Sequence, residues 1–129
     1  MRAADTNIVV RYLVADDDAQ FERASRFLEN APCWLGITVL LETEWVLRRA
    51  YKRTPMDIAA GLKLLYGLPM LTVERARDVA SAFDWFEQGM DFADALHLAT
   101  TQDCDGMVTF DRDFIKSAAR IGAGNVAEP

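Results

Sequence analysis

The feature that most constrains the fold of this chain is the alternation of short strand-like runs with longer helical stretches. In the helical stretches, apolar residues recur at the three- and four-residue spacing of a helix. The short runs between the helical stretches predict strands at residues 2–5, 33–37, 71–73 and 107–110, and residues 125–127 are a candidate fifth strand. Strands joined by crossovers of about a dozen residues are usually parallel. The sequence therefore predicts an α/β fold, a mostly parallel sheet with helices on both faces.

The helical stretches begin at residues that commonly start helices. The aspartates at positions 16–18 are expected to open a helix that reaches about residue 29, because aspartate accepts hydrogen bonds from free N–H groups there. Thr38 is the expected cap of a helix to about residue 52, and Pro55 opens the next. Further helices are predicted at 75–87, at 92–102 and after Asp113.

Length and composition indicate one globular domain over residues 1–129, with 51% hydrophobic and 26% charged residues. Acids exceed bases by 20 to 14, and the net charge is −6. This balance excludes a protein that holds nucleic acid by bulk positive charge, but not an enzyme whose acids form a metal site. Separate cysteines at 33 and 104 favour free thiols, and no apolar stretch is long enough to span a membrane. We therefore expect a soluble cytoplasmic protein.

Four carboxylates stand where an ordinary surface role is hard to assign. Asp5 and Asp111 each follow a predicted strand, so both are expected at the carboxyl edge of the sheet. Glu42 and Asp94 have no Lys or Arg three or four positions away, and most of their helical neighbours are apolar. Glu44, by contrast, has Arg48 four positions later and is expected to form an ion pair on a solvated face.

Unpaired carboxylates in such surroundings are costly. Two charges 4 Å apart repel by about 4 kcal/mol at an effective dielectric constant near 20. A divalent cation removes that cost, and oxygen ligands without Cys or His favour Mg²⁺ or Mn²⁺. The sequence leaves two interpretations open: a carboxylate metal site, or separate acids that are each solvated or capping a helix.

Four ordered segments resemble PIN-domain ribonucleases, and in particular the VapC toxins of bacterial toxin–antitoxin pairs. They are D-T-N at 5–7, L-E-T-E-W-V-L at 41–47, D-F-A-D-A-L-H-L-A at 91–99 and T-F-D-R-D-F at 109–114. The resemblance implies a single PIN-like nuclease domain, a three-layer α/β/α sandwich around a central five-stranded sheet. It also implies that Mg²⁺, or Mn²⁺, is held by four acids, Asp5, Glu42, Asp94 and Asp111.

The same resemblance assigns supporting positions. Thr6 and Thr109 match hydroxyls that orient water or ligands, whereas Asp91 and Asp113 are supplementary acids that a capping role would explain equally well. A basic row after Asp111 supplies candidates for RNA phosphate contacts, Arg112 and Lys116, with Arg120 one turn further on. His97, the only histidine, lies in an apolar helix, so a packed core residue is expected rather than a general base.

The activity implied by the resemblance is Mg²⁺-dependent endonucleolytic hydrolysis of RNA phosphodiesters by the toxin of a type II toxin–antitoxin pair. A VapB-type antitoxin and a second copy of the chain are the implied partners. Two alternative functions remain open: an RNA-processing PIN nuclease that is not a toxin, and a PIN scaffold without catalysis. A response-regulator receiver and a haloacid-dehalogenase-type phosphatase fit poorly, because the acidic pairs that they need after the first strand are missing.

Overall fold

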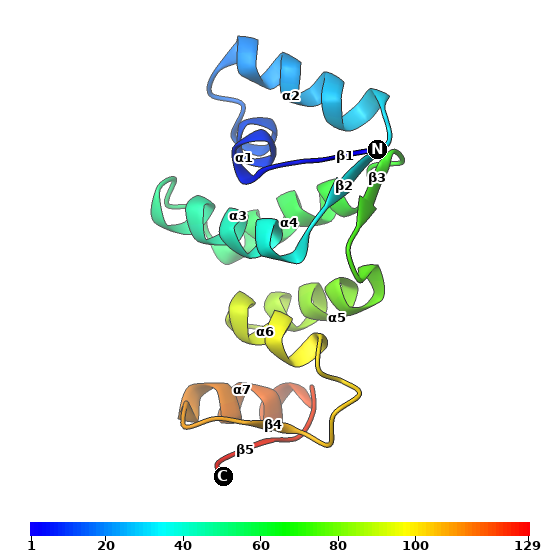
Figure 1. The fold of residues 1–129 in the computed structure, drawn as a ribbon. Coiled ribbons are helices and arrows are strands. Elements are labelled where there is room, and N and C mark those ends of the chain that lie inside the picture. The colour runs from blue at the N-terminus through cyan, green and yellow to red at the C-terminus, as the bar shows by residue number, and fades with distance from the viewer. The chain divides into compact units, whose positions relative to one another are not determined.

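The computed structural model describes all 129 residues, and the chain divides into two compact units, Met1–Ala76 and Arg77–Pro129. Figure 1 shows the elements of each unit. The first contains β1 (Arg2–Ala3), α1 (Thr6–Val14), α2 (Asp18–Asn30), β2 (Cys33–Leu35), α3 (Ile37–Arg49), α4 (Pro55–Tyr66) and β3 (Leu71–Val73). The second is built from α5 (Ala76–Glu87), α6 (Phe92–Ala99), β4 (Met107–Val108), α7 (Arg112–Ile121) and β5 (Val126–Ala127).

The first unit is organised around a parallel sheet in the order β1-β2-β3. Cys33 of β2 pairs with Arg2 on one side and with Leu71 on the other. Helix α1 packs against α2 and α3, α3 also packs against α4, and α4 contacts β3. The fully buried leucine and isoleucine side chains of this unit are Leu28, Leu35, Leu40, Ile58, Leu62 and Leu65. Each contributes about 1.5–3 kcal/mol relative to an exposed position.

The second unit has its own parallel pair, β4 and β5, with Met107 opposite Val126. Its core contains Phe92, which is 1% exposed at the start of α6. The ring of Phe92 stacks on Phe83 and meets Phe86 edge-on, with centroid separations of 6.1 and 5.1 Å. Such pairs add about 0.5–1.5 kcal/mol each beyond the area that they bury.

The prediction of an α/β fold with parallel strands is confirmed, but the single five-stranded sheet is not observed. The five strands form one three-stranded and one two-stranded sheet. Strands β1, β4 and β5 have only two residues each, so the hydrogen bonds of a ladder extend over a very short length. None of the helices combines the length and the apolar character that a membrane span requires. Both cysteines are free thiols, as expected.

The start of α3 differs from the prediction that Thr38 would cap this helix. The cap is Gly36, which has no side chain to offer. The N–H of Ile37 instead donates to Oε2 of Glu74 over 2.7 Å. Glu74 follows directly on β3, the strand next to β2, so the free N–H is satisfied from the neighbouring strand rather than from the helix itself.

Glu42 and Glu44, the two glutamates of α3, each lie in the kind of environment that was expected for the other. Glu44 is 3% exposed rather than on a solvated face, although its predicted ion pair forms: Nε of Arg48 lies 2.9 Å from Oε2. Glu42, expected among apolar neighbours, is exposed. Residues two apart on a helix differ by about 200° in direction. Helices α1 and α4 pack against α3, and Glu42 lies on the exposed side of α3 together with Thr38 and Trp45.

Candidate functional site

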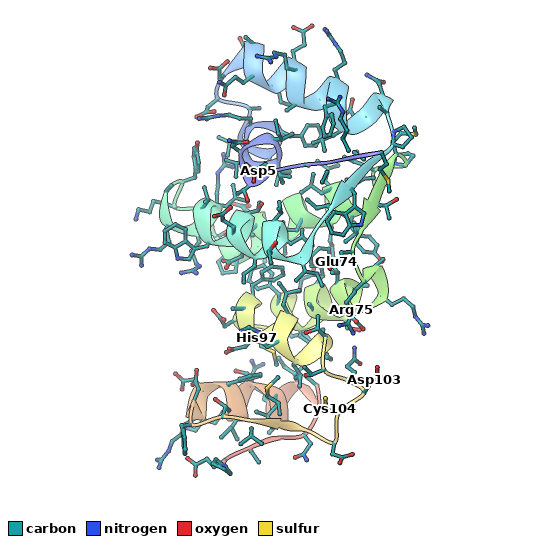
Figure 2. The ribbon with its side chains drawn as sticks, in the orientation of Figure 1. Asp5, Glu74, Arg75, His97, Asp103 and Cys104 are labelled. Carbon is teal, nitrogen blue, oxygen red and sulfur yellow. The ribbon has the colours of Figure 1, made fainter.

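Asp5 lies between the first strand and the first helix, at the carboxyl edge predicted for it. Its backbone is extended, with φ −86° and ψ 165°, and its Oδ1 accepts a hydrogen bond from the N–H of Thr6 over 2.8 Å. Figure 2 labels Asp5 where α1 begins. The side chain is exposed, and its second carboxylate oxygen makes no hydrogen bond within the protein. That oxygen is free to bind a ligand.

Thr6 links Asp5 to Glu42, a residue of α3. Its hydroxyl donates a hydrogen bond to Oε1 of Glu42, and the threonine itself is 7% exposed. Because Thr6 is held by the first turn of α1, the contact fixes the position of the otherwise exposed Glu42 carboxylate. The first unit thus brings together three of the predicted site residues.

We expect Thr6→Val to lower the free energy of unfolding by about 1 kcal/mol. Valine has nearly the same shape as threonine but cannot donate the hydrogen bond to the charged Glu42 carboxylate, and water can replace that bond only in part. Urea denaturation measures this change. Thr38→Val, at an exposed threonine of α3, is the matched control and is expected within about 0.5 kcal/mol of wild type. Equal effects of the two substitutions would contradict the role of the Thr6 hydroxyl.

In the second unit, Asp91 and Asp94 lie at the start of α6. Oδ2 of Asp91 caps the helix by accepting a hydrogen bond from the N–H of Asp94 over 3.1 Å. The Asp94 carboxylate is half-buried and accepts no hydrogen bond. Its burial, together with the negative charges of Asp91 and Asp111, raises its pKa from 3.8 to about 6, although His97 acts in the opposite direction. Asp94 therefore has too little positive charge nearby to stabilise its ionised form.

Asp111 is held by contacts on both sides. Its Oδ1 accepts hydrogen bonds from the N–H groups of Asp113 and Phe114, at 2.9 and 3.2 Å, which makes it the cap of α7. Its own N–H donates to the hydroxyl of Thr109 over 3.0 Å. Thr109 thus orients the backbone of Asp111, and Asp113 lies exposed in the first turn of the helix. The second oxygen of Asp111 has no hydrogen-bond partner in the protein.

The basic row that follows Asp111 is exposed. Arg112 forms a long, exposed ion pair with Glu128, with 3.9 Å between Nε and Oε1, and Lys116 has no ion pair. Arg120 instead donates to the carbonyl oxygen of Gln88 over 3.0 Å. Arg112 and Lys116 are therefore available to a ligand, whereas Arg120 is engaged within its unit.

Two residues differ from their expected roles. His97 is exposed rather than packed in the core, because it faces away from the apolar side of α6 that buries Leu96 and Leu98. Glu74 was not among the predicted site residues, yet it holds the start of the helix that carries Glu42. It stands directly after a strand, the signal that singled out Asp5, so the sequence could have drawn attention to it.

The residue types fit a divalent metal ion, although no three acidic, histidine or cysteine side chains are placed around a common point. The first unit holds Asp5 and Glu42, and the second holds Asp94 and Asp111. Each of these four carboxylates keeps at least one oxygen without a hydrogen bond in the protein. Carboxylate oxygens are the ligands that Mg²⁺ and Mn²⁺ prefer.

Comparison with known proteins identifies the family. A family model of the PIN domain matches residues 3–120. The chain belongs to the PIN domain family. This confirms the resemblance drawn from the four segments that carry the acids.

Among solved structures, this PIN protein is similar to the VapC20 toxin of Mycobacterium tuberculosis, described as a toxin that cleaves the sarcin-ricin loop. The identity is 22%, the match covers 91% of this chain and 95% of that one, and the TM-score is 0.45. Values this low do not transfer an activity. No curated protein sequence shows significant similarity to the chain.

Proposed function

We propose that this PIN protein is a metal-dependent endoribonuclease that acts as the toxin of a type II toxin–antitoxin pair. The observation that carries the proposal is the match of the PIN-domain model to residues 3–120, a span that contains all four acids. Burial and the charges of Asp91 and Asp111 raise the pKa of Asp94 to about 6, and a nearby cation would lower the cost of ionising this carboxylate. Asp5, Glu42 and Asp111, each with a free oxygen, complete the proposed ligand set for Mg²⁺ or Mn²⁺.

The proposal treats residues 1–129 as one domain in which all four acids serve a single site. Support comes from the family match, since one PIN model extends from residue 3 to residue 120 and so includes segments of both units. The strands are parallel in both units, and Asp5 and Asp111 each follow the carboxyl end of a strand.

The chain's own residues have distinct tasks in this mechanism. A divalent ion supplies the positive charge that stabilises a phosphodiester during in-line attack and promotes ionisation of water. Thr6 holds Glu42, and Thr109 holds the backbone of Asp111, so that these acids keep their positions without reorganisation. Asp91 caps α6 and thereby fixes the turn that carries Asp94. Arg112 and Lys116 contact phosphates of the RNA.

The proposed partners follow from the VapC resemblance in the sequence. They are an RNA substrate, a VapB-type antitoxin that covers the acids, and a second copy of the chain in a homodimer. We place the activity in the cytoplasm, where RNA and such antitoxins meet. The net charge of −6 supports a basic or amphipathic antitoxin segment.

The test is cleavage of a pool of structured RNAs by the purified chain, with Mg²⁺ and with excess EDTA. We expect internal cleavage with Mg²⁺ and at least about 100-fold less with EDTA, because the charge supplied by the ion is lost. Cleavage that survives EDTA would overturn the metal-dependent mechanism. Absence of both cleavage and Mg²⁺ binding in calorimetry would favour the alternative of a PIN scaffold. A neighbouring reading frame for a DNA-binding antitoxin would separate a toxin from an RNA-processing nuclease.

A further inference from the structure

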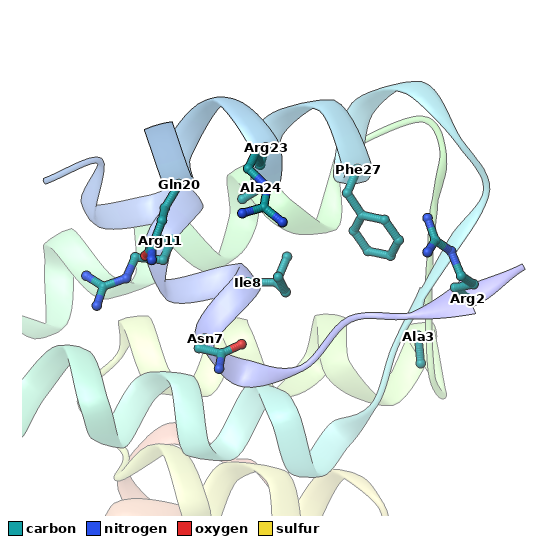
Figure 3. A pocket seen from close by; sticks show the side chains of 9 residues that line it. All are labelled: Arg2, Ala3, Asn7, Ile8, Arg11, Gln20, Arg23, Ala24 and Phe27. Carbon is teal, nitrogen blue, oxygen red and sulfur yellow. The ribbon is translucent and has the colours of Figure 1, made fainter. Parts of the chain in front are cut away.

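A basic pocket lies in the first unit, among β1, α1 and α2. Its volume is about 620 Å³, and Figure 3 shows the side chains around it. Helix α2 lines it with Gln20, Arg23 and Phe27, which are spaced three and four residues apart and so share one helix face. Helix α1 contributes Arg11, and β1 contributes Arg2.

The charge of this pocket is opposite to that of the whole protein. Three of the 14 basic residues, Arg2, Arg11 and Arg23, line it, and no Asp or Glu does, in a chain with a net charge of −6. Neither Arg2 nor Arg23 has an ion pair with a carboxylate. Arg2 and Arg23 therefore give the pocket positive charge that no carboxylate neutralises, whereas Arg11 is paired with Asp16.

Two of these arginines are held in place by their neighbours. The guanidinium of Arg2 lies over the ring of Phe27, 5.1 Å from its centroid. Nη1 of Arg11 donates to Asp16 over 3.0 Å and to the hydroxyl of Tyr51 over 3.2 Å. Ordered guanidinium groups lose little side-chain freedom when they bind an anion, and their planar donors match phosphate oxygens. Arg23, which is exposed, has no such restraint.

We propose that this pocket binds a phosphate and an adjoining base of the RNA, at a nucleotide next to the cleaved bond; the inference rests on the proposed function. Asp5 stands three residues after Arg2 along extended chain, about 10 Å away at 3.3 Å per residue. Arg11 is six residues further along α1, about 9 Å at 1.5 Å per residue. The pocket is thus within reach of a neighbouring nucleotide of a substrate held at Asp5.

The other side chains of the pocket favour RNA over an acidic peptide. The guanidinium of Arg2, which lies over the ring of Phe27, is itself a planar group on which a base can stack. Asn7 and Gln20 add amide groups that can donate to and accept from a base edge or a 2′-hydroxyl. An acidic peptide offers carboxylates to the arginines but no base that could stack on the planar guanidinium of Arg2.

The experiment measures binding of a fluorescently labelled, ten-nucleotide single-stranded RNA of mixed sequence to the full chain, in EDTA so that binding is separated from cleavage. We expect Arg23→Gln to weaken binding about 10-fold and the double substitution Arg2→Gln, Arg23→Gln about 100-fold. Each lost phosphate contact should reduce the slope of log affinity against log salt by about 0.7. The matched control is Arg26→Gln, which removes an exposed arginine one turn along α2 that pairs with Glu22, and is expected within about twofold of wild type.

The outcomes separate this inference from the proposed nuclease activity. If the wild-type chain fails to cleave RNA but binds it through Arg2 and Arg23, RNA binding by the pocket holds, whereas the nuclease proposal and the position beside a cleaved bond fall together. If cleavage occurs but Arg23→Gln and Arg26→Gln bind RNA equally well, the inference is overturned. Binding of polyglutamate in preference to RNA, lost in the Arg23 variant, would also overturn it and indicate an acidic protein partner.

Discussion

Asp94→Asn is expected to reduce the rate of RNA cleavage by more than about 100-fold with Mg²⁺ at pH 7.5. Asparagine keeps the size of the side chain but removes the charge that a hard divalent ion requires from its ligands. Loss of groups that only orient metal ligands already costs about 10–100-fold, so loss of a ligand itself should cost more. Single-turnover cleavage of a fixed RNA substrate measures the effect, and Asp5→Asn is expected to behave alike.

Two other aspartates provide controls for this prediction. Asp84, on α5, is exposed and its side chain makes no hydrogen bond, so Asp84→Asn should leave the rate unchanged. Asp91 caps α6, and asparagine caps a helix about as well as aspartate does. Asp91→Asn therefore retains most of the activity if Asp91 only caps, and loses it if Asp91 binds the ion. A rate for Asp94→Asn above one tenth of wild type would contradict a ligand role for Asp94.

Asp5 and Asp111 could be placed from the sequence because their positions depend on local rules. Asp111 follows a short apolar run, Asp5 follows a very short predicted strand, and both precede a helical stretch, where aspartate is a favoured helix cap. Both side chains do cap their helices, α1 and α7. The sequence could not show that each aspartate uses one oxygen for the cap and keeps the other free, since that division follows from the backbone conformation.

The environments of Glu42 and Glu44 could not be predicted in the same way. Both have apolar residues at helical spacing, so the pattern along α3 does not say which of its sides neighbouring helices cover. That choice depends on the packing of α1 and α4, which lie far away in the sequence or beyond a turn. The hydrogen bond from Thr6 to Glu42 and that from Ile37 to Glu74 likewise join residues more than 30 positions apart.

The basic pocket could not be predicted from the sequence either. Its arginines stand at positions 2, 11 and 23, with no cluster in the sequence to mark them. The visible basic cluster at 48–53 contributes nothing to the pocket. Charge that converges from a strand and two helices becomes apparent only when those elements are packed together.

Without divalent metal, wild-type stability is expected to decrease relative to Asp94→Asn as the pH rises from about 4 to about 7. The folded chain raises the pKa of Asp94 from 3.8 to about 6, so in this range the folded state binds the proton more tightly than the unfolded state does. That contribution to stability is fully present below pH 4 and is lost as the pH rises through 6. Because the side chain is partly exposed, solvent screening limits the difference to about 1 kcal/mol.

Urea denaturation of both proteins in EDTA at several pH values measures this difference, with Asp84→Asn as the control that should show no trend.

Adding Mg²⁺ at pH 7.5 should instead stabilise the wild-type chain relative to Asp94→Asn, because an ion that binds the ionised carboxylate stabilises the folded state. At a concentration ten times its Kd, the gain is about 1.4 kcal/mol, or about 5 °C in Tm for a chain of this size. Asp94→Asn should gain little. An equal Mg²⁺-induced shift in both proteins would exclude Asp94 as a ligand, since the substitution removes the charge on which the stabilisation depends.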